Sequence, residues 1–113
     1  PATRARRPRC PDRRNVAVIA YDQLATFEFG IATEIFALRR PEITAPWYRC
    51  RVCAVEPGPI RAKGGIVISA DAGLAALRWA GTIVIPGWRS AGELPPDPLL
   101  RELRRAYARG RAC

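Results

Sequence analysis

The sequence predicts an α/β domain with a doubly wound, mostly parallel sheet and a small β-hairpin. Two short apolar runs, 16–20 and 82–85, have the continuity of central parallel strands that are covered on both faces. The first run leads through Tyr21 and Asp22 into a helical pattern, and the second leads into Pro86-Gly87-Trp88. Parallel strands end at a common rim where loops and helix N-termini converge, so we expect any ligand site there.

The first strand and the helix after it begin the folded region, near Asn15. The run 16–20 is the strand, and Thr26 is expected to cap the following helix. Residues at the i, i+3, i+4, i+7 spacing of a buried helical face are Phe29, Ala32, Thr33 and Phe36, with Ile35 beside them. Arg39, Arg40 and Pro41 mark the expected end of this helix.

The second strand and a hairpin are expected next. Residues 47–55 are rich in aromatic and β-branched side chains, and a right-handed crossover would place this strand parallel to the first. After the turn Pro57-Gly58-Pro59, the extended pieces 60–63 and 66–68 flank Gly64-Gly65. This pattern predicts a small β-hairpin beside the main sheet.

The last part of the chain predicts a short helix, a strand and a long helix. Asp71 is expected to cap the short helix through Leu74 and Leu77, and Gly81 introduces the strand 82–86. The long helix is expected to begin at 95–98 and to stop at Gly110. Its buried face is a stripe of Leu99, Leu100, Leu103 and Tyr107. Its outer face carries Arg101, Arg104, Arg105 and Arg109. Because another strand is expected after this helix, we predict a sheet incomplete at the C-terminus, with an exposed edge at 82–86 that favours a homodimer.

Length and composition indicate one globular domain with a basic leader. The chain has 113 residues, of which 49% are hydrophobic and 26% charged, with a net charge of +9. Residues 1–14 are expected to be a disordered basic leader, with the folded domain at 15–113; the leader's arginines are Arg4, Arg6, Arg7, Arg9, Arg13 and Arg14. A general bias toward arginine explains this charge better than nucleic-acid binding, which remains an alternative.

Several kinds of chemistry are excluded or disfavoured. The sequence contains no histidine, so this chain supplies no imidazole base or ligand. No stretch has the roughly 18 apolar residues of a membrane span and no signal peptide is recognisable, so we expect a cytoplasmic protein without a membrane partner. Cys50 and Cys53 would point to opposite faces of one strand. We therefore expect ordinary thiols, no metal and no cofactor.

Two residues of the expected rim have possible chemical roles. Glu28, between Phe27 and Phe29, lies near the start of the first helix, where a carboxyl in partly apolar surroundings suits acid–base chemistry. Composition alone favours the alternative, a solvated glutamate placed favourably in the helix dipole. Gly87 allows a sharp turn whose amides can hold an oxyanion or carboxylate, although a plain turn explains it equally well.

Four segments together resemble the PfpI-type, class I glutamine amidotransferase-like superfamily: VAVIAYD (16–22), FEFGIATEIF (27–36), WYRCRVCAVEPGPIRAKGG (47–65) and TIVIPGW (82–88). The resemblance covers residues 15 to 110 and implies a flavodoxin-like sheet. The nearest likeness is to the sensor domain of GlxA-type AraC-family transcriptional regulators. In those regulators the domain precedes a helix-turn-helix that binds DNA.

Enzymes of this superfamily use a cysteine on a strand-to-helix elbow, supported by an acidic residue that Glu28 matches. Gly87 and Trp88 match the turn that lends amides to this site, with Trp88 replacing a second glycine. The elbow is expected beyond Gly110, and Cys113 comes too early to be assigned as the nucleophile.

The resemblance therefore implies a truncated, non-catalytic ligand-sensing domain that lacks its helix-turn-helix. An unknown small-molecule effector would bind at Asp22, Glu28, Gly87 and Trp88. The alternative is a thiol hydrolase or lyase of the same superfamily, of the deglycase, glyoxalase, isonitrile hydratase or peptidase type.

Overall fold

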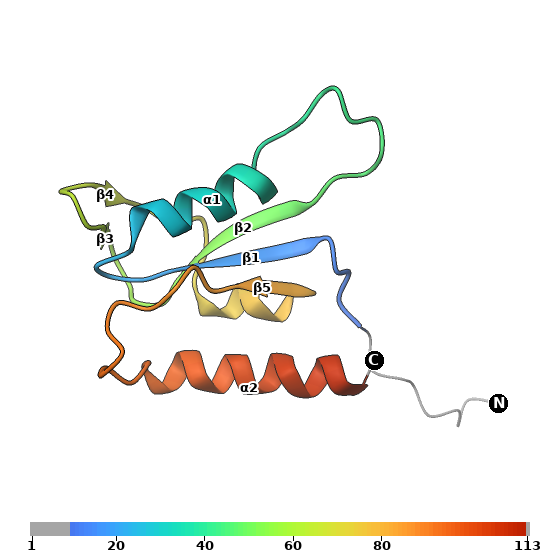
Figure 1. Cartoon of the computed structure of the whole chain (residues 1–113). Coiled ribbons are helices and arrows are strands. Elements are labelled where there is room, and N and C mark those ends of the chain that lie inside the picture. Colours follow the sequence, from blue (N-terminus) through green and yellow to red (C-terminus); the bar gives the residue numbers. More distant parts are fainter. Residues whose placement is uncertain (1–9, 113) are drawn as a thin grey trace.

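The computed structural model describes residues 10–112, which form a parallel sheet covered on both faces and a separate two-stranded ribbon (Figure 1). The main sheet has the strand order β2-β1-β5, and all its pairings are parallel. Its strands are β1 (Asn15–Ala20), β2 (Arg49–Ala54) and β5 (Thr82–Val84). Helix α1 (Thr26–Phe36) covers one face, and the 3-10 helix η1 (Leu74–Arg78) and helix α2 (Asp97–Ala112) cover the other. The predicted α/β fold class is confirmed.

Strand β1 is the centre of the fold, and all six of its residues are buried. Val16 and Val18 pack with Ala32 of α1 on one face, whereas Ala17 and Ile19 join the larger core with η1 and α2 on the other. Since both faces are covered, polar and apolar residues do not alternate along this strand, and it is apolar from Val16 to Ala20. The parallel pairing of β1 with β5 confirms that their ends lie side by side.

Helix α1 differs from its predicted ends. Ala25, not Thr26, is the N-cap residue, and no side chain caps the helix. The helix stops at Phe36, before the expected Arg39–Pro41. Its buried face is confirmed at Ala32, with partly buried Phe29, Thr33 and Phe36 beside it, but Ile35 is 44% exposed because it turns away from the sheet.

The hairpin is confirmed as the antiparallel pair β3 (Ile60–Arg61) and β4 (Val67–Ile68). The helix that follows it is a 3-10 turn whose N-cap is Gly73, without a side-chain hydrogen bond. The predicted capping role of Asp71 is therefore wrong, because that residue lies two positions before the cap. Leu77, in contrast, is fully buried as expected.

Helix α2 packs on η1 through Leu99, which is 2% exposed, and partly buried Leu103. Tyr107 is 69% exposed and does not continue the buried stripe. Arg109 turns inward and donates a hydrogen bond to the Leu77 carbonyl at 3.2 Å. Gly110 does not stop the helix, which runs on to Ala112.

Part of the expected leader contacts the sheet. The Thr82 hydroxyl donates to the Arg13 carbonyl and the Arg49 amide donates to the Arg14 carbonyl, each at 2.8 Å. A Cβ at Gly81 would overlap the backbone of Asp12, so this crossing requires glycine. Residues 1–9 and Cys113 lie outside the described residues. The disorder expected for the leader therefore stays a prediction there.

Candidate functional site

The loops after β1, β2 and β5 meet at one rim of the sheet, as parallel strands require. The Val55 amide donates to the Ala20 carbonyl at 2.9 Å, which holds the end of β2 against the end of β1. The loop after β1 also reaches the hairpin, because the Gln23 amide donates to the Arg61 carbonyl at 2.6 Å. The rim is thus a joined structure rather than three independent loops.

Arg89 links these loops through charged hydrogen bonds. Its Nη1 donates to Glu56 Oε1, just after β2, at 2.6 Å. Its Nε donates to Glu93, four residues further along its own loop. The other Glu56 oxygen accepts the Asp22 amide at 2.9 Å, so the loop after β1 joins the same cluster. The Arg89 side chain is 13% exposed, which strengthens these interactions relative to a surface pair.

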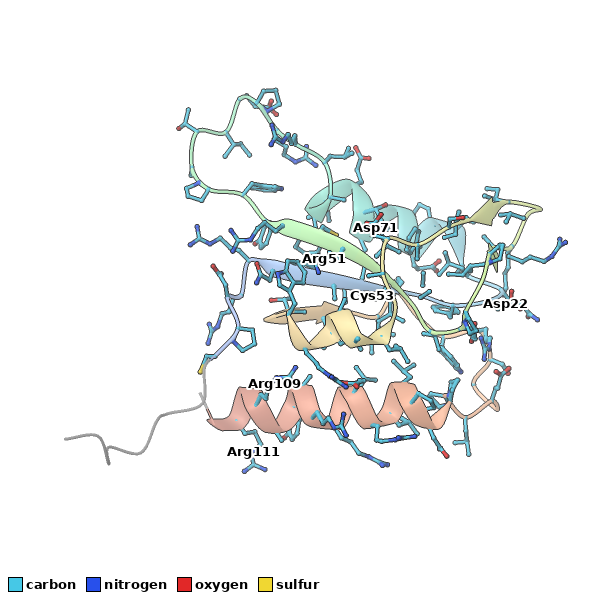
Figure 2. The ribbon with its side chains drawn as sticks, turned by 180° about the vertical axis from the view of Figure 1, so that it is seen from behind. Asp22, Arg51, Cys53, Asp71, Arg109 and Arg111 are labelled. Atoms are coloured by element: carbon cyan, nitrogen blue, oxygen red, sulfur yellow. The ribbon has the colours of Figure 1, made fainter. Side chains whose placement is uncertain are left out.

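A pocket of about 430 Å³ lies beside this cluster. Its lining residues are Asp22, Gln23, Glu56, Pro57, Pro59, Ile60, Arg89 and Glu93. This volume lies in the range of small-molecule sites. Figure 2 shows Asp22 beyond the end of the sheet, beside the hairpin. Polar groups and an apolar wall therefore converge at the rim where the sequence predicts a site.

A second, larger cavity of about 660 Å³ opens between the end of β2 and the segment before η1. It is lined by residues 54–59 and 69–74, most of which are glycine, proline or aliphatic. Its charged side chains are Glu56 and Asp71, so it offers no cationic group. The pocket beside Arg89 has the richer chemistry.

Tyr21 lies between the predicted site residues. Its ring is fully buried and packs against Trp88, with ring centroids 5.0 Å apart. Gly87 has a φ of +105°, and a Cβ added there would lie 3.6 Å from the Tyr21 hydroxyl. Burial raises the pKa of Tyr21, and the negative charge of Glu28 adds to this rise.

The predicted site residues therefore do not form one cluster of touching side chains. Asp22 lines the pocket, and Gly87 and Trp88 surround Tyr21. Glu28 is exposed on the first turn of α1, beside Phe27, which is itself 75% exposed. The apolar surroundings expected for Glu28 are thus missing on that side. The functional assignment of these four residues stays a prediction.

Sequence reasoning missed Glu56, Arg89 and Glu93. A signal was available, because Glu56 comes two residues after β2 ends and Arg89 comes two residues after Gly87. Both positions follow strands whose ends meet at one rim. Only the strand order shows that these opposite charges meet.

The two cysteines of β2 are unlike catalytic thiols. Cys53, labelled beside the sheet in Figure 2, is fully buried, and burial raises its pKa to about 11. Cys50 is partly buried on the α1 face, and burial raises its pKa as well. The two side chains lie on opposite faces of the sheet, as predicted, because Cys53 belongs to the core under η1. Neither is poised as a thiolate near neutral pH.

Within residues 10–112, no group of three histidine, cysteine, aspartate or glutamate side chains is arranged to hold a metal ion. The helices of the same region also lack the combination of length and apolarity needed to cross a bilayer.

Comparison with known proteins identifies the fold. No protein-family model matches the chain, and no curated protein matches it. The crystal structure of the DJ-1 superfamily protein Atu0886 from Agrobacterium tumefaciens is similar, with a TM-score of 0.60 and 17% sequence identity. The match covers 84% of this chain and 48% of that protein, so the chain spans about half of that relative's length. The chain therefore shares its fold with about half of this DJ-1 superfamily structure.

Proposed function

We propose that this chain is the N-terminal part of a non-catalytic ligand-sensing domain from a GlxA-type, AraC-family transcriptional regulator. The observation that carries the proposal is the pocket beside Arg89, where an ion pair and a backbone hydrogen bond join loops from three parallel strands. A ligand bound there touches all three loops at once. Its binding energy is therefore coupled to the arrangement of the whole rim, as sensing requires.

The thiols of β2 support a binding role over a catalytic one. Cys50 and Cys53 lie within the strand rather than at its end, and burial raises the pKa of both. A nucleophilic cysteine needs a stable thiolate at an accessible position. In this interpretation Glu28 is a surface residue at the helix N-terminus, where its charge is favourable.

Ligand-dependent stabilisation tests the proposal. The intact chain is screened against polar metabolites by thermal unfolding. A ligand present at 100 times its dissociation constant adds about 2.7 kcal/mol of stability. A chimera completed with the C-terminal half and helix-turn-helix of a GlxA-type regulator should then bind DNA in a ligand-dependent manner. A panel without any thermal shift, together with ligand-independent DNA binding, contradicts the proposal.

A thiol hydrolase or lyase is the second candidate. It is favoured by the turn at Gly87, whose positive φ matches a loop that presents amides, with Glu28 close enough to influence Tyr21. This function predicts turnover of methylglyoxal, an amide or a nitrile that iodoacetamide abolishes and that Glu28→Gln weakens. An intact chain without turnover on these substrates excludes it.

The homodimer also stays a proposal. Within the described part of the chain β5 pairs with β1 alone, and Ile85, just beyond β5, is 48% exposed. An open strand edge of this kind favours association. Light scattering on freshly purified protein should give twice the chain mass, and a monomer mass at micromolar concentration contradicts the dimer.

A further inference from the structure

The Arg89 guanidinium has an unused hydrogen-bond donor at the wall of a pocket. Nη1 contacts Glu56 and, at 3.4 Å, the Asp22 carbonyl, and Nε contacts Glu93. Nη2 donates no hydrogen bond to any described residue and is not among the buried unpaired atoms. An arginine fork with an open, accessible nitrogen is a natural partner for a carboxylate.

The charge of the lining argues against a simple anion. Asp22, Glu56 and Glu93 carry three negative charges and Arg89 carries one positive charge, so the lining has a formal net charge of −2. An anion would meet this unfavourable potential, and a simple cation would gain nothing from the Nη2 donor and would be repelled by the guanidinium charge. A ligand that carries both charges satisfies both sides of the pocket.

The two charges of such a ligand must be close together. The carboxylates of Glu56 and Glu93 both contact the same guanidinium, so anionic and cationic protein groups lie within a few bond lengths of one another. An α-amino acid has its ammonium and carboxylate on adjacent atoms, which matches this proximity. Pro57, Pro59 and Ile60 line the pocket as well and provide an apolar wall for an aliphatic side chain.

We propose that the pocket between the ends of β1, β2 and β5 binds a small zwitterion of the α-amino-acid type. Its carboxylate accepts from Nη2 of Arg89, and its ammonium lies near the carboxylates of Asp22 and Glu93. Its aliphatic side chain contacts Pro57 and Pro59. The inference rests on the proposed sensing function and specifies the class of ligand.

Three probes of matched shape separate the two charges. L-Leucine carries both, 4-methylpentanoate lacks the ammonium, and 3-methylbutylamine lacks the carboxylate. Each is titrated into the intact chain and followed by isothermal calorimetry or NMR. L-Leucine should bind at least tenfold more tightly than either analogue. Equal or tighter binding of an analogue overturns the zwitterion assignment.

Two variants locate the charges and one controls for nonspecific effects. Asp22→Asn keeps the oxygen that accepts the Arg61 amide, so the loop is preserved while the charge is lost. This substitution should weaken the binding of L-leucine at least tenfold, and 4-methylpentanoate should bind no more weakly than to the wild type. Arg89→Lys keeps the charge but removes the forked guanidinium, and it should weaken the binding of both L-leucine and 4-methylpentanoate tenfold. Glu34→Gln, on the exposed side of α1, should change nothing.

The outcomes separate this inference from the sensing proposal. If Asp22→Asn and Arg89→Lys bind L-leucine as the Glu34→Gln control does, the assignment of the site is wrong. If an anionic or neutral metabolite stabilises the chain while L-leucine does not, the zwitterion class is wrong and sensing stands. If no metabolite and no probe binds, both proposals are contradicted.

Discussion

Replacing Arg89 with methionine should destabilise the protein substantially, because the guanidinium joins loops from all three strands of the sheet. Methionine retains the aliphatic stem but removes the hydrogen bonds to Glu56 and Glu93 and the contact with the Trp88 ring at 4.5 Å. The Glu56 carboxylate, 31% exposed, would keep the Asp22 amide as its partner.

The magnitude follows from burial. A hydrogen bond to a charged group contributes about 1.5–3 kcal/mol, whereas an exposed ion pair contributes about 0–1 kcal/mol. The Glu56 bond belongs to the first kind because Arg89 is 13% exposed, and the bond to Glu93, 46% exposed, belongs to the second. We expect Arg89→Met to lower the free energy of unfolding by about 2–3 kcal/mol, which corresponds to a fall in Tm of roughly 10 °C or more.

Urea denaturation of five proteins measures this effect. The wild type, Arg89→Met, Glu56→Gln and the double variant form a thermodynamic cycle, and Arg101→Met on the exposed side of α2 is the control. The losses of unfolding free energy in the two single variants should add up to at least about 1 kcal/mol more than the loss in the double variant, because the effects of contacting residues are not additive. Full additivity, or an Arg89→Met loss no greater than that of Arg101→Met, refutes the role given to this cluster.

Three further predictions concern the rest of the fold. Gly87→Ala should lower the unfolding free energy by about 1–2 kcal/mol, because the φ of Gly87 is +105° and alanine is strained there. Gly92→Ala, at an ordinary φ with open space around it, should lower it less. Equal losses in urea unfolding contradict backbone strain at residue 87. The hydrogen bond from Arg78 lowers the pKa of Glu102, so the pair stabilises the fold above the ordinary carboxyl pKa of 4.5 and loses this contribution as pH falls. Urea unfolding of Glu102→Gln should therefore show a flatter decline of stability in acid than the wild type, and parallel curves refute this. Cys53, with a pKa of about 11, should resist iodoacetamide at pH 8 until the protein unfolds, as mass spectrometry of labelled peptides can show; rapid labelling of the native protein contradicts its burial.

The sheet was predictable because its strands are buried on both faces. The run 16–20 has no polar residue, and a central parallel strand buried on both faces is expected to have such a sequence. The hairpin was equally clear from Gly64-Gly65 between extended pieces, and both glycines have positive φ. These features depend on local sequence, which a single chain displays directly.

The helix ends were less predictable, because capping depends on the path of the backbone rather than on residue type alone. Thr26 has a suitable side chain, yet Ala25 occupies the N-cap position. Gly110 has the residue type of a stop signal, but the helix passes through it. Arg109, the residue directly before Gly110, is anchored to η1 by its hydrogen bond to the Leu77 carbonyl. Tertiary contacts near the end of the helix can outweigh the modest cost of one glycine.

The site was predictable only in its location. The rim follows from the parallel strands, and Asp22 lines the pocket there, whereas its role in binding stays a prediction. Arg89 and Glu56 are 33 residues apart, and nothing local distinguishes them from other charged residues. Their pairing depends on β2 and β5 lying on either side of β1.

The central claim is that three strand-end loops form one ligand-binding rim around Arg89. Titration of the isotope-labelled intact chain with L-leucine, followed by backbone amide chemical shifts, tests it directly. The claim predicts that the perturbed amides cluster at Asp22, Gln23, Glu56, Arg89 and Glu93, and that they saturate with one dissociation constant. Perturbations centred on another face of the protein, or none at saturating ligand, contradict it.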